Sequence, residues 1–324
     1  MKALIKRLPV QPDLDIVALR RYTLAFAAFL VVASVFLFAA RGLNLGVDFR
    51  GGILMEVRTE AAAADIPAIR RTMNGLGLGD VSIQEFGEPD TVLMNIQEQP
   101  GGSEGQQAAI ERVRAALDGR VAEYRRVESV GPKVGEELKR AGMMATGLAL
   151  LAMAAYIWFR FEWQFALAAL VALIHDIVAT IGFFALTQLE FSLGTVAAIL
   201  TIAGYSINDT VVIFDRVRES MRRYKSKTLT VILNIAVNGT LIRTALTSGT
   251  TLLALAALAV FGGEVIRSFT WGLIWGVGIG TFSSVGLAVP LLIYMKVRPS
   301  TLDTAAEESD KEAAERAAGS GASS

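Results

Sequence analysis

The chain has 324 residues, of which 53% are hydrophobic, and its mean hydropathy is +0.47, with the charged residues gathered between long apolar stretches. This profile is typical of a membrane protein with several spans. The formal net charge is zero, which argues against nucleic acid as a partner, and the absence of cysteine and the single histidine, His175, exclude disulfides, thiolate zinc sites, cysteine nucleophiles and multi-histidine metal sites.

The polar segment 1–21 carries five basic residues ahead of an apolar run at 22–40. Because positive charge is retained on the cytoplasmic side, this order predicts a cytoplasmic N-terminus. The apolar core of a cleaved signal peptide is usually about 7 to 15 residues long, and this run is longer and follows a long polar leader. We therefore predict a retained first transmembrane span at 22–40.

The segment 41–140 is soluble in character and opens with Gly-Val-Asp-Phe-Arg-Gly-Gly at 46–52. Its patterns predict strands at 53–57, 81–86, 91–96 and 123–128 and helices at 64–75 and 103–117. The order β-α-β-β-α-β predicts a small ferredoxin-like domain, which is periplasmic if the first span leaves the cytoplasm. Gly51 and Gly52 are predicted to form a turn with a close backbone approach, because neither a lysine nor a helix start follows them as in a phosphate loop.

Gly131 and Pro132 end this domain, and five further apolar runs follow. They predict spans at 141–159, 163–186, 191–214, 240–261 and 269–295, a cytoplasmic loop at 215–239 and a disordered cytoplasmic tail at 296–324. Six basic residues in the loop agree with four crossings from a cytoplasmic start. The predicted fold class is an α-helical polytopic membrane protein, with six transmembrane helices and a small α+β ferredoxin-like periplasmic domain between the first and second.

The stretch 204–219 sets one carboxylate, Asp209, inside an otherwise apolar run. An aspartate near the centre of a membrane helix costs about 2.5 to 3.5 kcal/mol, so we expect it to face a bundle interior or a cavity and to find a partner there. Helical spacing places a supporting polar stripe on the same side, made of Thr201, Gly204, Tyr205 and Asn208. Two interpretations stay open: the stripe forms hydrogen bonds between helices, or Asp209 titrates. The choice of an acid over a neutral amide favours titration.

Other ionisable residues in the predicted spans are His175, Asp176 and Arg243. Burial disfavours a charged carboxylate whereas a nearby arginine favours it, so an aspartate under both influences can exchange a proton near neutral pH. We predict Asp209 with Arg243 as the first proton-coupling pair, and Asp176 as a further member whose role stays open. Adjacent residues point to different faces of a helix, so His175 and Asp176 are not expected to line one site, and His175 is equally well explained by helix packing.

Small residues recur every four positions in the last predicted span, at Gly272, Gly276, Gly280 and Ser284. Such a face lets another helix approach closely, and we predict tight packing there. Walker, nucleophile-elbow and H-E-x-x-H motifs do not occur in the sequence, so we expect no enzymatic activity, no catalytic residues, no metal site and no cofactor, with protons as the coupling ion.

Several of these stretches resemble the SecD/SecF family of bacterial protein-export proteins, within the resistance-nodulation-division (RND) transporter superfamily. The matching stretches are G-V-D-F-R-G-G at 46–52, V-G-P-K-V-G at 130–135, the His175-Asp176 pair and G-Y-S-I-N-D-T-V-V-I-F-D-R-V-R-E at 204–219. The resemblance implies a six-helix SecF-type half that pairs with SecD into a twelve-helix, proton-driven accessory. It further implies docking on the SecYEG channel, YajC and YidC as further partners, and use of the proton motive force to complete preprotein export after the ATPase SecA has acted.

The resemblance also carries proton coupling to Asp209 and to Arg243. Some family members have another acid at the start of the last span, where Ser268 stands here, so a third acid would have to be Asp176 or come from SecD. The implied location is the bacterial inner membrane, in contact with lipid, with both termini cytoplasmic. Two alternatives remain: half of an RND-type proton-coupled exporter of small molecules, against which the chain length argues, and a membrane scaffold without a transport cycle.

Overall fold

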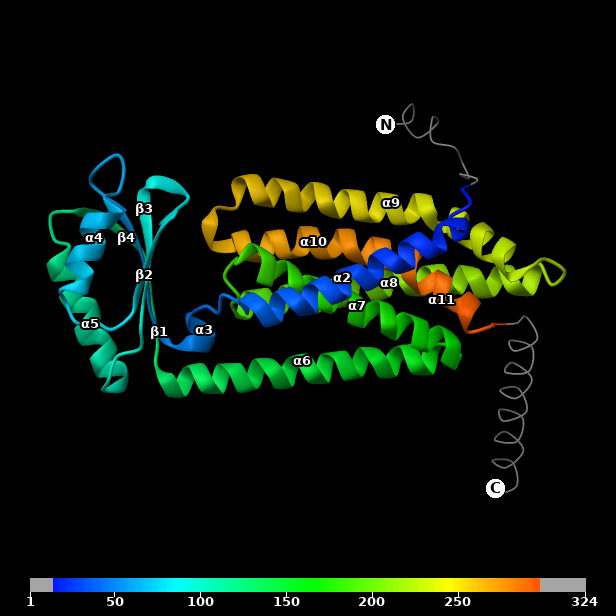
Figure 1. The fold of residues 1–324 in the computed structure, drawn as a ribbon, viewed down its shortest axis with the longest axis horizontal. Coiled ribbons are helices and arrows are strands. Elements are labelled where there is room, and N and C mark those ends of the chain that lie inside the picture. The colour runs from blue at the N-terminus through cyan, green and yellow to red at the C-terminus, as the bar shows by residue number, and fades with distance from the viewer. Residues whose placement is uncertain (1–13, 298–324) are drawn as a thin grey trace, which may run out of the picture.

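The computed structural model describes residues 14–297, and the predicted leader before residue 14 and tail after residue 297 lie outside that range. It shows an α/β domain on one side and a bundle of long helices on the other (Figure 1). The bundle helices are α2 Arg20–Arg41, α6 Pro132–Arg160, α7 Trp163–Thr187, α8 Leu193–Arg223, α9 Leu229–Phe261 and α10 Arg267–Ser283. Within the described range six helical stretches are long and apolar enough to cross a membrane. The predicted class, an α-helical polytopic membrane protein, is confirmed.

Several helices run further than the predicted spans. The segment predicted as a cytoplasmic loop at 215–239 is largely helical, because α8 continues to Arg223 and α9 already begins at Leu229. At 1.5 Å per residue the 31 residues of α8 span about 46 Å, more than the hydrocarbon core of about 30 Å. Its charged last turns therefore extend beyond the membrane without leaving the helix. Similarly, the stretch 132–140, assigned to the α/β domain from sequence, forms the start of α6.

The charged end of α8 is tied to the short turn between α6 and α7. The Arg160 guanidinium pairs with the Asp215 carboxylate at 2.7 Å, and Arg218 pairs with Glu162 at 3.0 Å. Figure 1 shows this end of the bundle opposite the α/β domain. These contacts agree with an interfacial charge cluster rather than with intramembrane groups.

The last span is not one regular helix. α10 is followed by a π-helical turn, η3 Ser284–Ala288, and then by α11 Val289–Tyr294. Pro290 has no N–H to donate to the carbonyl four residues earlier, so the hydrogen-bond pattern widens at this point. The π-turn starts at Ser284, directly after Ser283, and both hydroxyls enter the polar contacts described below.

The α/β domain has a four-stranded antiparallel sheet in the order β2-β3-β1-β4. Its elements are β1 Gly52–Thr59, α4 Ile66–Asn74, β2 Val81–Phe86, β3 Glu88–Ile96, α5 Gly102–Ala116 and β4 Val121–Val130. This order and topology are those of a ferredoxin-like domain, as predicted. Both helices pack on one face of the sheet, around a core that includes Ile53, Met94 and Val113. The other face looks toward the bundle (Figure 1).

A short helix, α3 Val47–Arg50, precedes β1 and leads into the two glycines. Gly51 and Gly52 have φ values of +71° and +112°, where L side chains are strained. A Cβ on Gly52 would also collide with the backbone carbonyl oxygen of Ile96 on β3. The predicted turn with a close backbone approach is therefore confirmed.

The segment before β1 attaches the domain to the turn between α7 and α8. The Asp48 carboxylate accepts the backbone N–H of Leu193, in the first turn of α8, at 2.8 Å. Gly46 N–H donates to the Phe191 carbonyl at 3.0 Å, and Phe191 N–H donates to the Asn44 carbonyl at 2.7 Å. The glycine-rich segment thus joins the first strand of the domain to the end of a central membrane helix.

Gly52→Ala should destabilise this junction, because it combines an unfavourable φ with a backbone collision. We expect a loss of at least about 1 to 3 kcal/mol, measured as a lower temperature of thermal unfolding of the full chain in detergent. Gly119→Ala is the matched control, since Gly119 also has a positive φ of +69° but its Cβ would meet no atom within 4 Å. Equal losses in the two variants would contradict the importance of the close approach.

Candidate functional site

The most buried carboxylate in the described bundle is that of Asp176 on α7, which is 0% exposed. Its Oδ2 accepts hydrogen bonds from the Ser206 hydroxyl on α8 at 2.5 Å and from the Ser283 hydroxyl on α10 at 2.7 Å. Its Oδ1 lies 2.9 Å from Nδ1 of His175. One side chain thereby joins three membrane helices at one depth.

The expectation that His175 and Asp176 would not line one site is wrong. Both side chains are buried and they contact each other. α7 lies in the middle of the bundle, where α2 packs against one side and α8 and α10 against another, so two neighbouring faces of the helix are both interior. Nε2 of His175 has no hydrogen-bond partner among the described residues.

Asp209 has a different environment from Asp176. It is 7% exposed, and its Oδ1 accepts the Thr244 hydroxyl of α9 at 2.7 Å. Its Oδ2 is enclosed by protein but has no partner in the described part of the chain. Arg243, the predicted partner, is exposed, and the ion pairs of the described residues do not include one between it and Asp209. The structure therefore places the two predicted residues near each other without direct pairing, and Thr244 is the contact that sequence reasoning missed.

The polar stripe on α8 does not face the interior of this chain. Thr201, Gly204 and Asn208 are exposed, whereas Tyr205 is half-buried and donates to the Ser248 hydroxyl at 3.2 Å. Ser248 in turn lies 2.7 Å from the hydroxyl of Thr281. Within this chain the stripe is thus only partly enclosed: Asp209 and part of Tyr205 are covered.

The small residues of the last span lie where α10 approaches α7 and α8. A Cβ on Gly272 would lie 2.8 Å from the Phe184 ring, one on Gly276 would collide with Ile202, and one on Gly280 would lie 3.2 Å from Cβ of Ser206. Ser284 lies 2.9 Å from the hydroxyl of Thr210. Close helix approach is what brings Ser283 within reach of Asp176.

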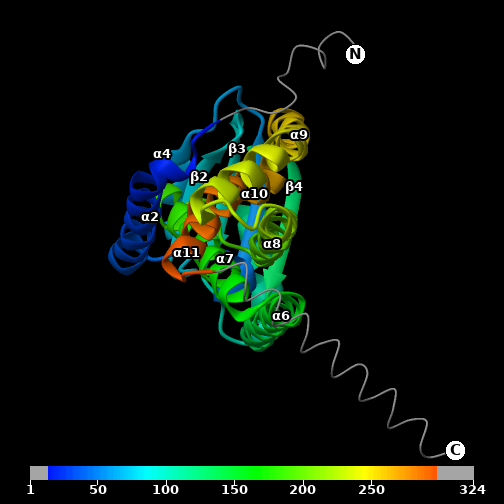
Figure 2. The ribbon, with the colours of Figure 1, turned by 90° about the vertical axis from the view of Figure 1, so that its right-hand side faces the viewer.

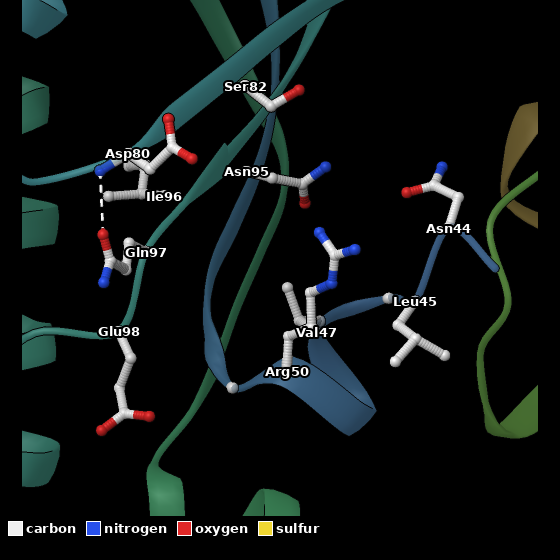
Figure 3. A pocket seen from close by; sticks show the side chains of 12 residues that line it. Asn44, Leu45, Val47, Arg50, Asp80, Ser82, Asn95, Ile96, Gln97 and Glu98 are labelled. Carbon is white, nitrogen blue, oxygen red and sulfur yellow. Dashed lines mark hydrogen bonds between the residues drawn. The ribbon is translucent and has the colours of Figure 1, made fainter. Parts of the chain in front are cut away.

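The junction between domain and bundle holds a second polar region, a pocket of about 470 Å³ (Figure 3). The side chains of Arg50 from α3 and Asn95 from β3 point into the same space, and Oδ1 of Asn95 has no partner among the described residues. These residues were not singled out from the sequence. The sequence signal that could have pointed to this region is the alternation in β2, where Ser82 is polar and Ile83 is apolar.

Glu190, in the turn between α7 and α8, lies beside this junction against Gly46. Burial raises the pKa of the Glu190 carboxyl above its ordinary value, and the charges of Asp48 and Glu128 raise it further. The Arg126 guanidinium opposes this effect. The junction therefore contains an acidic group whose charged form is disfavoured, outside the membrane-spanning segments.

Comparisons with known proteins match both halves of this arrangement. A family model for the C-terminal part of the protein export membrane proteins SecD and SecF matches residues 110–298, and one for the SecD/SecF GG motif matches residues 36–63. The protein translocase subunit SecF of Rickettsia felis is 42% identical over 89% of this chain and 94% of the relative, and that of Cereibacter sphaeroides is 45% identical over 90% and 93%. The chain belongs to the SecF subunits of the SecD/SecF family.

Solved structures agree with this assignment. The chain resembles the crystal structure of SecDF, a translocon-associated membrane protein from Thermus thermophilus, with a TM-score of 0.79 and 34% identity over 89% of this chain. A super-membrane-facing form of SecDF gives a TM-score of 0.64 and 31% identity. This chain spans 39% of the length of the first SecDF chain and 40% of the second. Sequence and structure thus agree on the SecF family, and the chain has the role of a protein translocase subunit in a membrane.

The two aspartates should respond differently to substitution. Asp176→Ala should lower the free energy of unfolding by about 2 to 4 kcal/mol, because Ser206, Ser283 and His175 lose a shared buried acceptor. Asp209→Asn should change it by less than about 0.5 kcal/mol, because Asn keeps the oxygen that accepts from Thr244. Thermal unfolding of both variants in detergent, followed by tryptophan fluorescence, measures the difference. If Asp209→Asn is as destabilised as Asp176→Ala, the two carboxylates do not differ in the way described.

Proposed function

We propose that this SecF-family chain couples proton movement at Asp209 to protein export, as one half of an assembly with a SecD subunit. The observation that carries the proposal is that Oδ2 of Asp209 has no hydrogen-bond partner in the described range 14–297. A buried carboxylate oxygen without a donor requires a proton, a cation or a partner group, since leaving it unsatisfied costs about 1 to 3 kcal/mol or more. A proton meets that requirement reversibly.

Arg243 supports this role, since the ion pairs of the described residues include none between it and Asp209. A permanently paired carboxylate would be held in its charged form, whereas a nearby but unpaired arginine allows both states. One charge moving through a membrane potential of 100 mV supplies about 2.3 kcal/mol, so a few protons per cycle are enough to shift a two-state equilibrium. Asp176, which accepts two hydroxyl hydrogen bonds and contacts the His175 ring, fits the role of a fixed contact between helices better than that of a second proton carrier.

The exposed polar stripe supports the pairing with SecD. Thr201, Gly204 and Asn208 lie in a membrane-spanning helix and face away from the rest of the chain. Polar groups on a lipid-facing surface are unfavourable, and small polar residues are common where membrane helices pack. A SecD half covering this stripe would also enclose Arg243 and the open side of Asp209.

The remaining parts of the proposal concern location and partners. By the positive-inside rule, the basic residues between Arg216 and Lys227 support a cytoplasmic end of α8, and hence an α/β domain in the periplasm of a bacterial inner membrane. We propose that the assembly acts at the SecYEG channel, beside YajC and YidC, after SecA has used ATP. The family resemblance supports these partners.

Replacing Asp209 by Asn should abolish the response to a proton gradient and preserve assembly. The measurement is late, ATP-independent completion of preprotein translocation in vesicles that contain SecD, the channel and this chain, with and without an imposed gradient. The variant is expected to show only the rate observed without a gradient, because Asn keeps size and polarity but does not titrate.

Asp215→Asn is the matched control, since Asp215 lies on the same helix but in the exposed charge cluster with Arg160. It should keep the gradient response. If the Asp209 variant responds to the gradient as the wild type does, the polar stripe only holds helices together and the scaffold hypothesis is favoured.

A further inference from the structure

The helix that leaves the α/β domain, α6, stands partly apart from the bundle. Most of its residues are exposed, and it lies along one edge of the molecule (Figures 1 and 2). It is held at its start by contacts with α3 and near its end by Ile157, which is 0% exposed. Between these two points it lines a cavity.

That cavity has a volume of about 440 Å³ and is almost entirely apolar. Its walls are α6, α7 and α8, and the end next to the α/β domain is closed by Leu45, Phe49 and Phe191. Small residues on α6 create the space. A Cβ on Gly147 would meet no atom within 4 Å, and one on Gly142 would only reach van der Waals contact with Leu193 at 3.4 Å.

The cavity is elongated along α6. It extends from Gly142 to Leu150, which is about 12 Å at 1.5 Å per residue. These walls are mostly apolar and offer water few polar partners. Within the hydrocarbon region the surrounding solvent consists of lipid acyl chains.

One charged side chain lines this cavity, that of Lys139, which is exposed and lies in α6 at the end nearest the α/β domain. No ion pair among residues 14–297 involves it. A lysine just beyond an apolar cavity can extend its ammonium group to the membrane interface. Its position matches that of a negatively charged headgroup whose acyl chain enters the cavity.

We propose that the cavity between α6, α7 and α8 binds one acyl chain of an anionic phospholipid from the leaflet next to the α/β domain, with the headgroup phosphate paired to Lys139. The bound acyl chain occupies the space between α6 and the bundle. Since α6 follows β4 directly, the lipid supports the helix that carries the domain. This site is separate from Asp209 and does not depend on proton coupling.

The test counts lipids bound to the full-length chain by native mass spectrometry. The purified protein is titrated with phosphatidylglycerol or phosphatidylcholine of the same acyl chains. Wild type should retain one phosphatidylglycerol more firmly than phosphatidylcholine, by about tenfold. Gly147→Leu should lower the affinity for both lipids about tenfold, because the side chain occupies the cavity. Leucine also favours a helix more than glycine, so this variant should fold.

Lys139→Gln should remove the preference for phosphatidylglycerol while phosphatidylcholine still binds. Gly278→Leu is the matched control, since a Cβ on Gly278 would also meet no atom within 4 Å but this glycine lies on α10, and the variant should behave as wild type. The proposal is overturned if Gly147→Leu keeps wild-type lipid binding, if Gly278→Leu loses as much, or if Lys139→Gln keeps the headgroup preference. Copurification of a polypeptide in place of lipid would also overturn it.

Discussion

A carboxylate inside a membrane needs hydrogen-bond donors, a proton or an opposite charge, because the lipid offers none of these. The bundle meets this need in two ways. Asp176 accepts hydrogen bonds from hydroxyls on α8 and α10, contacts the His175 ring on α7 and is fully covered. Asp209 receives one donor from α9, and its other oxygen has no partner among residues 14–297. The first arrangement fixes helices relative to each other, and the second leaves a group that can change its state.

The close packing of the last span allows the hydrogen bonds to Asp176 to form. Glycines on α10 let it approach α8, and the consecutive hydroxyls of Ser283 and Ser284 reach different partners, Asp176 and Thr210. At the other end of the bundle, Asp48 and the two following glycines hold the α/β domain against the start of α8. α8 therefore contacts both the domain and the carboxylates, so a change at Asp209 occurs in the helix to which the domain is attached.

The sequence was sufficient for the fold because its strongest signals are local. Apolar runs, the β-α-β-β-α-β order and the turn at Gly51 and Gly52 each depend on a few neighbouring residues. The helical content of the segment 215–239 was not predicted, because charge marks where a helix leaves the membrane and not where it ends. The site was predicted less fully. Asp176 and Asp209 could be singled out as intramembrane acids, but their partners Ser206, Ser283 and Thr244 come from other helices, and helical periodicity alone does not say which faces meet.

The central claim is that Asp209 changes its protonation state while Asp176 serves as a fixed contact. Infrared difference spectroscopy of the full chain assembled with SecD in lipid, recorded as the pH is changed, tests it directly through the C=O stretch of protonated carboxyl groups. If Asp209 exchanges the proton, a reversible carboxyl band is missing in Asp209→Asn and kept in Asp215→Asn. A reversible band that persists unchanged in Asp209→Asn would show that another group titrates.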